Sequence, residues 1–168
     1  MKIHRVFGGF PAGAFVAFAL MTAVALAAHA GEGEDAAADA APLTEAQCIE
    51  ILQGDADWLA KQTACRRLVH VGTQASVPAL AALLTDETLS HMARYALEPM
   101  AYPEADQALR EALGKAEGMP KAGIVISIGV RRDEEAVPLL IPLMKAEHPE
   151  VARTAAGALG RIATQEAM

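Results

Sequence analysis

Hydrophobic and small residues recur along this chain at a nearly constant interval after residue 43. A leucine-rich run returns at Ile51, Leu80, Leu109 and Leu140, so its period is roughly thirty positions. A second apolar run carries an alanine with nearly the same period, at Ala64, Ala93, Ala122 and Ala152. Two markers with one period indicate four copies of a unit that is too small to bury its apolar face alone. The copies are therefore expected to stack into an all-α solenoid.

Each copy has the pattern of two helices joined by a short turn. In the first copy, residues 44–53 and 57–71 have helical periodicity, and Thr44 is a favourable N-cap residue. Gly54 and Asp55 separate the two segments, and Gly72 closes the second. Glycine and aspartate are typical of helix ends, so the pattern predicts a helical hairpin.

The other three copies show the same arrangement. The remaining expected helices span 76–85, 88–98, 104–113, 121–130, 133–146 and 150–164. The corresponding units of the domain over 43–164 are 44–72, 73–101, 102–131 and 132–163. A turn is expected at 117–120, where glycine and proline interrupt the third copy. Pro138 and Pro142 each lack a backbone donor and are expected to bend the helix that contains them.

The segment over 1–30 has the three parts of a secretory signal peptide. Lys2 and Arg5 precede an uncharged run over 6–28, and Ala28-His29-Ala30 places small residues at a cleavage site. The pattern predicts export to the periplasm or the extracellular space. The alternative is an uncleaved N-terminal membrane anchor, because the apolar run is long enough to span a bilayer.

Removal of residues 1–30 changes the composition of the chain. All four phenylalanines lie in that segment. Without Lys2 and Arg5, 12 of the 14 basic residues remain against 21 acidic residues, a net charge of −9. Such a chain repels nucleic acid and anionic lipid as a whole. Residues 31–42 are acidic and alanine-rich without apolar periodicity, which predicts a disordered spacer.

Two cysteines, Cys48 and Cys65, fall in the first copy on its two expected helices. In an oxidising compartment they can form a disulfide across the hairpin. The alternative is a pair of small core residues with free thiols, because only some facing positions on packed helices allow a bridge.

The chain from residue 31 shows no pattern typical of catalysis or of a resident cofactor. Its histidines, His70, His91 and His148, lie in different copies without a second metal ligand three or four residues away. No phosphate-binding glycine loop or nucleophile-elbow motif occurs in the sequence. We therefore expect neither an enzyme nor a metal or cofactor site.

The last copy carries a recognisable family pattern. The stretch over 148–162, His-Pro-Glu-Val-Ala-Arg-Thr-Ala-Ala-Gly-Ala-Leu-Gly-Arg-Ile, resembles the second helix of a HEAT repeat, especially the short phycobilisome-lyase-like type. Val-Pro-Ala-Leu at 77–80 and Val-Pro-Leu-Leu at 137–140 extend the resemblance, which covers 44–163. It implies a right-handed superhelix of about four hairpins, with the inner helices along the concave side.

Two details refine this resemblance. Residues 89–99 and 127–133 are similar to exported bacterial HEAT-repeat proteins. In the family an arginine usually follows the valine of the inner helix and forms a polar ladder between repeats. Here Ala93 and Ala152 occupy those places. The sequence therefore leaves that ladder in doubt.

The candidate binding residues lie on the expected inner helices, where the resemblance places the concave face. They are Arg66, His91, Arg94, Tyr95, Glu98 and Arg153. Arginines beside a tyrosine suit a protein or peptide partner of acidic character. The alternative is structural, with Arg94 and Glu98 as an ordinary helical ion pair and Tyr95 packed between repeats.

Together these patterns predict an exported, non-catalytic scaffold that binds another protein through the inner-helix face. Two alternatives stay open at this point. One is a ligand-handling, lyase or chaperone-type subunit, as the family resemblance implies. The other is a structural assembly element of the cell envelope that associates end to end, because the last copy has no obviously polar cap.

Overall fold

The computed structural model describes residues 42–166, a range that contains helices and turns and no strand. The expected all-α class is confirmed. The predicted signal segment and all but the last residue of the predicted spacer lie outside the described residues. In chain order the α-helices are α1 (Glu45–Gln53), α2 (Trp58–Val71), α3 (Val77–Ala81), α4 (Ser90–Leu97), α5 (Pro103–Lys115), α6 (Gly118–Arg131), α7 (Val137–Leu143) and α8 (Pro149–Glu166). Short 3-10 helices over Gln74–Ser76 and Glu134–Ala136 lead into α3 and α7.

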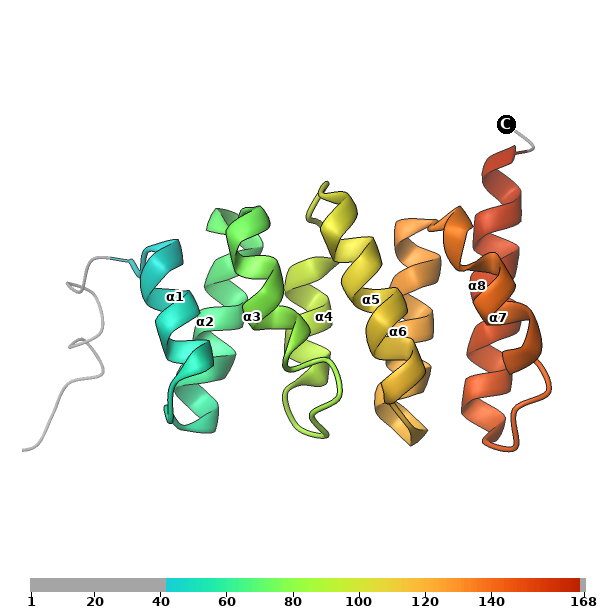
Figure 1. Ribbon diagram of the computed structural model, residues 1–168, viewed down its shortest axis with the longest axis horizontal. Coiled ribbons are helices and arrows are strands. Elements are labelled where there is room, and N and C mark those ends of the chain that lie inside the picture. The colour runs from blue at the N-terminus through green and yellow to red at the C-terminus, as the bar shows by residue number, and fades with distance from the viewer. Residues whose placement is uncertain (1–41, 167–168) are drawn as a thin grey trace, which may run out of the picture. The chain divides into compact units, whose positions relative to one another are not determined.

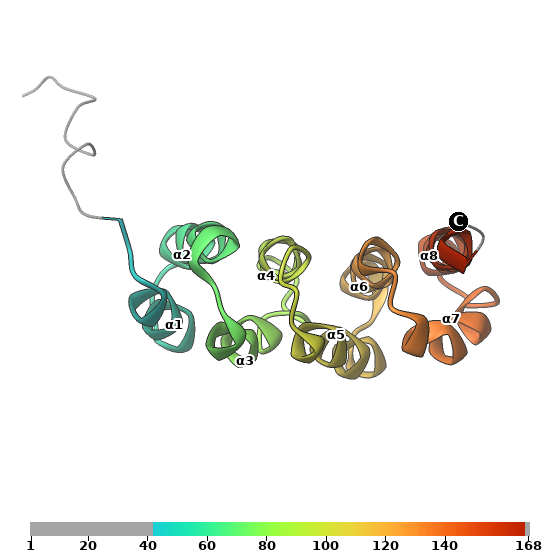
Figure 2. The same cartoon turned by 90° about the horizontal axis from the view of Figure 1, so that it is seen from above.

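Consecutive helices pair as antiparallel hairpins, α1 with α2 and so on to α7 with α8 (Figure 1). Figure 2 shows two layers, with α2, α4, α6 and α8 in one row and α1, α3, α5 and α7 in the other. We call the first row the inner layer and the second the outer layer. Helices also pack on their counterparts in the next hairpin, such as α2 on α4 and α6 on α8. The expected architecture of four helical hairpins is confirmed.

The first hairpin follows its sequence signals closely. Thr44 caps α1 in a reciprocal arrangement, in which Gln47 N donates to Thr44 Oγ1 at 3.4 Å and Thr44 N donates to Gln47 Oε1 at 2.9 Å. Asp57 Oδ1 accepts from Ala60 N at 2.8 Å and caps α2. Gly54 and Gly72 are the C-caps. Side-chain oxygens thus satisfy amide groups that the first turn of a helix leaves unpaired.

The second hairpin has shorter helices than its pattern predicts. The expected helix over 76–85 is regular only over Val77–Ala81, and the following residues form turns. The helix expected from residue 88 begins at Ser90. Asp86 causes the delay, because its Oδ1 accepts from the backbone N–H groups of Thr88 and Leu89 at 2.8 Å each. Aspartate favours such local bonds over continuation of a helix.

The turn predicted at 117–120 lies earlier in the structure, because only residues 116 and 117 separate α5 from α6. α6 begins at Gly118, whose φ of +52° suits glycine, and Pro120 lies in its first turn. Proline is tolerated there because the first amides of a helix have no partner within the helix. The same reasoning corrects the expected effect of Pro138, which lies in the first turn of α7 and removes no helical bond. Pro142 is inside α7.

The core is a continuous stack of aliphatic side chains between the two layers. Leu68, Leu97, Ile128 and Ala158 come from successive inner helices and are fully buried. The outer layer supplies Leu52, Leu80, Leu109 and Leu140, none of them more than 4% exposed. Each hairpin contributes the same few leucines, isoleucines and alanines, so no hairpin has a core of its own.

A polar ladder joins successive hairpins, although the residues at the usual family places are alanines. Thr73 N donates to Glu45 Oε1 at 2.6 Å, and Gln74 Nε2 donates to Glu104 Oε1 at 2.7 Å. Further along, Arg110 Nη1 donates to Asp133 Oδ2 at 2.6 Å. None of these bonds involves position 93 or 152, so the doubt about a ladder at those places stands. The bonds come from the outer helices and the connecting loops.

Candidate functional site

The six candidate binding residues all lie on the inner layer, but they do not form one cluster. Arg66 is exposed on α2, and His91 and Tyr95 are exposed one helical turn apart on α4. Arg153 is exposed on α8, on the far side of α6 (Figure 2). Arg94 and Glu98 are partly buried on α4. The exposed members are therefore spread along the layer.

Arg94 points toward the next hairpin instead of toward solvent. Its Nη1 donates to Gly123 O at 3.0 Å and to Ser127 Oγ at 3.4 Å, both on α6. Ser127 Oγ in turn donates to Glu98 Oε1 at 2.7 Å. Burial lowers the pKa of the Arg94 guanidinium, and its Nε is buried without a hydrogen-bond partner. Arg94 and Glu98 thus tie α4 to α6.

Arg153 forms a local ion pair on α8. Its Nε donates to Glu150 Oε2 at 3.0 Å, and its Nη2 contacts the other carboxylate oxygen. The Arg153 side chain is 70% exposed. An exposed pair three residues apart contributes little to stability. The guanidinium is therefore accessible to a partner molecule at little structural cost.

A pocket of about 160 Å³ lies between α6 and α8 on the inner layer. Its lining consists of Ile126, Arg153, Thr154, Gly157 and Arg161. A Cβ added at Gly157 would meet no atom within 4 Å, so this position leaves the α8 backbone open to the surface. The pocket combines an apolar side chain with two guanidinium groups.

Exposed hydrophobic side chains on the inner layer were missed at the sequence level. Leu59 is 62% exposed on α2, and Met119 and Val130 are 65% and 49% exposed on α6. Tyr95, which the sequence had already made a candidate, is 50% exposed on α4. Apolar residues in a helical pattern are usually core residues, and Met119 fell in the turn predicted at 117–120. Met119 and Val130 are separated by about three full helical turns, and this spacing is the signal that places both on one helical face.

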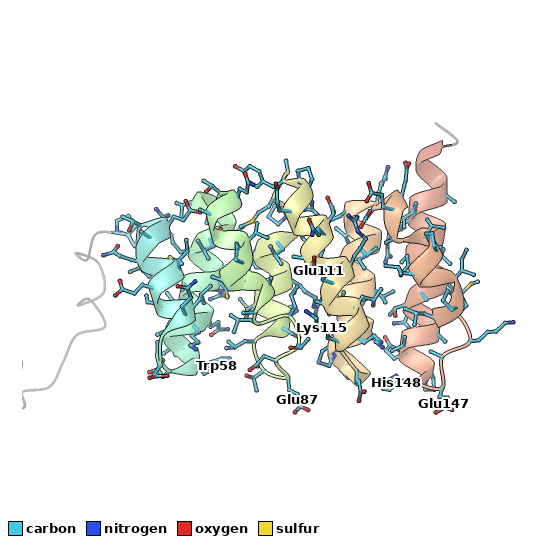
Figure 3. The ribbon with its side chains drawn as sticks, viewed as in Figure 1. Trp58, Glu87, Glu111, Lys115, Glu147 and His148 are labelled. Atoms are coloured by element: carbon cyan, nitrogen blue, oxygen red, sulfur yellow. The ribbon has the colours of Figure 1, made fainter. Side chains whose placement is uncertain are left out.

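His148 lies at one of several hairpin turns that carry exposed side chains and that stay apart. His148 and Glu147 lie in the exposed turn before α8, and Trp58 and Glu87 lie at other hairpin turns along the same edge (Figure 3). No group of three or more histidine, cysteine or acidic side chains in residues 42–166 is placed to hold a metal ion. None of the helices in this part of the chain has the length and hydropathy needed to cross a bilayer.

Cys48 and Cys65 are both fully buried and unbridged in the first hairpin. Burial raises the pKa of the Cys65 thiol to about 11, and the neighbouring Cys48 adds to the shift. Burial also raises the pKa of Cys48. The predicted disulfide stays a prediction.

Comparison with known proteins agrees with the helical hairpins and their period. The family model described as HEAT repeats matches residues 45–119 and again 119–168. A comparison with curated proteins gave no significant match. The two matched segments together cover nearly all of the described residues, and the chain belongs to the HEAT-repeat family.

Proposed function

We propose that this protein is an exported, non-catalytic scaffold that binds another protein through the solvent-exposed face of its inner layer, which α2, α4, α6 and α8 form. HEAT-repeat domains are generally protein-interaction scaffolds. One observation supports this use most directly. Leu59, Tyr95 and Met119 expose half or more of their side-chain surface on three successive inner helices. Large apolar side chains that are exposed on the same face of a protein are typical of interaction sites when they form a patch.

The charged residues among these side chains favour an acidic partner. Arg66, Arg153 and Arg161 are exposed on the same layer. Arginine and aromatic side chains are enriched where interfaces contribute most of their binding energy. The chain as a whole has a formal net charge of −7 and repels an acidic partner. The arginines on this layer attract such a partner and therefore favour one orientation of binding.

Affinity capture with matched variants tests the proposal. The inner-layer variant replaces Arg66 and Tyr95 with alanine. The control replaces Glu111 and Lys115, two exposed residues of the outer helix α5 (Figure 3). We expect partner recovery from the native envelope fraction to fall at least tenfold for the first variant only. Equal recovery with both variants would contradict the proposal, and a bound chromophore in the absorbance spectrum would favour a ligand-handling subunit.

Export is the second part of the proposal, and the N-terminal sequence supports it. A basic start, an uncharged run and an Ala-His-Ala end before residue 31 have the order of a cleaved signal peptide. Fractionation and N-terminal analysis of the natural product test this part. The expected product is found outside the cytoplasm and begins at Gly31. A product that retains residues 1–30 would indicate the membrane-anchored alternative.

A structural assembly role is a second candidate, favoured by the open flank of the last hairpin. Val77–Leu84 and Val137–Met144 occupy corresponding places in their hairpins, because each begins as a helix directly after a 3-10 turn. Ala79 is 4% and Leu84 0% exposed, because α5 packs on α3. Their counterparts Leu139 and Met144 are 44% and 45% exposed. No helix within residues 42–166 covers α7 in the way that α5 covers α3.

The flank of α8 beside these residues also carries no charged side chain. Ala152, Ala156, Leu159 and Ala163 follow one another at helical spacing on the side turned away from α6. If a second copy of the chain packs the same flank against this one, the exposed apolar side chains of both copies become buried. Light scattering over a range of concentrations tests this association. We expect a dimer that Leu139→Glu dissociates, and a monomer at every concentration would exclude it.

A further inference from the structure

α6 has an outward-facing stripe that differs from those of the other three inner helices. On α6 this stripe consists of Met119, Ile126 and Val130, and the buried Gly123 lies between them beneath the Arg94 side chain. Met119 and Val130 are the exposed residues of this helix, all of which the structure describes, and Ile126 is half-buried. No member of the stripe carries a polar side chain.

Each of the neighbouring inner helices exposes polar or charged side chains among its apolar and small ones. α2 exposes Thr63, Arg66 and His70 beside Leu59. α4 exposes His91 beside Tyr95, and α8 exposes Arg153 and Arg161. These helices share the fold and the solvent exposure of α6. All four inner helices pack against neighbouring helices through their other faces. Packing between repeats therefore does not explain why the α6 stripe is apolar.

Guanidinium groups border this stripe on both sides. From α4, Arg94 lies over Gly123, where an added Cβ would be 2.4 Å from its Cζ. From α8, Arg153 and Arg161 line the pocket that Ile126 also lines. Glu98 accepts from Ser127, and Glu150 accepts from Arg153 in an exposed pair that a carboxylate of a partner can share or replace. A surface with an apolar centre and cationic borders is thus built into a chain of net negative charge.

We propose that the α6 stripe is the docking site for an amphipathic helix of a partner protein, whose apolar face is flanked by carboxylates. This inference rests on the proposed scaffold function and names the chemistry of its partner. Met119, Ile126 and Val130 are separated by seven and four residues, which is about 10 and 6 Å along α6. A helix laid along α6 presents apolar side chains at the same intervals. Its acidic side chains then meet Arg153 and Arg161 in charge-assisted pairs.

Selection from a phage-displayed library of random 16-residue peptides tests this proposal. The purified protein is the target, and the Met119→Gln/Val130→Thr variant is the counter-target, because both substitutions preserve side-chain size. We expect enriched peptides to carry apolar residues at intervals of three, four or seven, with aspartate or glutamate beside them. Enrichment of lysine- and arginine-rich peptides would overturn the charge assignment.

Fluorescence anisotropy with the enriched peptides then locates the site. Met119→Gln/Val130→Thr is expected to weaken binding at least tenfold and to leave the melting temperature unchanged. The matched control, Ile141→Thr/Lys115→Gln, changes exposed positions of the outer helices α7 and α5, and should bind as the parent does. Arg153→Gln should weaken acidic peptides several-fold.

Other results would separate this inference from the scaffold function. Peptides that lose affinity with Tyr95→Ala but bind equally to Met119→Gln/Val130→Thr would overturn the α6 assignment and retain the inner surface as a binding face. Peptides that bind all these variants equally would overturn both. Binding to anionic vesicles that needs Met119 and Val130, without any peptide enrichment, would assign the stripe to a lipid surface and overturn the proposal.

Discussion

Gly129 on α6 and Ala158 on α8 lie so close that a Cβ added to Gly129 would be 2.7 Å from the Ala158 Cα. The atom that it would meet belongs to a helix backbone, which cannot move aside without shifting α8. Contact between these helices therefore requires glycine at this position. The alanine at 158 serves the same purpose, because small side chains let two inner helices approach closely.

Gly129→Ala should consequently destabilise the domain. Overpacking of a close contact costs about 1–3 kcal/mol, which outweighs the roughly 0.5–1 kcal/mol that alanine gains over glycine within a helix. Urea unfolding followed by circular dichroism measures the difference. Gly157→Ala on α8 is the matched control, since a Cβ there meets no atom within 4 Å. That variant should be as stable as the parent or slightly more stable, and a similar loss in both variants would contradict the packing argument.

Arg131 gives a second prediction, because it holds the end of α4 against the third hairpin. Its Nη1 donates to the backbone oxygens of Leu97, Glu98 and Met100 at 2.9, 3.0 and 2.6 Å. Its Nε donates to Asp106 Oδ1 at 2.5 Å, and the arginine side chain is only 8% exposed. Arg131→Ala removes these bonds, leaves the Asp106 carboxylate without this cation, and should cost about 3–5 kcal/mol.

The adjacent Arg132 is the control for this substitution. It is exposed, and Arg132→Ala should change the unfolding free energy by less than about 0.5 kcal/mol. Thermal and urea unfolding of the two alanine variants provide the comparison. Equal stability of the two variants would show that the network around Arg131 is not needed to hold α4 in place.

The sequence predicted the helices well where local signals decide the structure. Thr44, Gly54, Asp57 and Gly72 mark the first hairpin, and each makes the cap or stop expected of its residue type. These signals act within a few residues, so a single sequence contains them. The same logic failed at Gly118, because glycine and proline that usually end a helix here begin one.

The candidate site was less predictable, because its side chains respond to neighbouring hairpins. The helical pattern placed Arg94 on the exposed face of α4. In the structure it turns onto α6, where Gly123 leaves space for the guanidinium. That space is a property of a residue in the next copy of the repeat. Met119 and Val130 are apolar yet exposed, which no single-helix pattern distinguishes from core packing.

Asp86 supports a prediction on pH dependence. Its carboxylate accepts from the Thr88 hydroxyl and from the backbone N–H groups of Leu89 and Thr88, which lowers the pKa of Asp86 in the folded state. A group with a lowered folded pKa stabilises the fold fully above its unfolded pKa, which is about 3.9 for aspartate. That contribution is lost as the pH falls through the folded pKa.

Asp86→Asn removes the titration and keeps the side-chain shape. The parent should exceed this variant in unfolding free energy by about 0.5–1.5 kcal/mol near neutral pH, because the charged acceptor is lost. The difference should stay constant down to about pH 5 and shrink below about pH 4. Urea unfolding between pH 7 and the acid limit of folding provides the measurement. A difference that grows toward low pH would have the wrong sign.

The buried thiols give a prediction on reactivity in the reduced protein. Cys48 and Cys65 are 0% exposed, and burial raises the pKa of Cys65 to about 11. The thiolate is the reacting form, so only about one Cys65 side chain in a thousand is reactive at pH 8 even before access is considered. Iodoacetamide should therefore leave the folded protein unlabelled over hours and label both cysteines in denaturant, as mass spectrometry will show. Rapid labelling of the folded protein would contradict the burial of the pair. For protein purified without reductant, labelling in denaturant that needs prior reduction would demonstrate a bridge between Cys48 and Cys65.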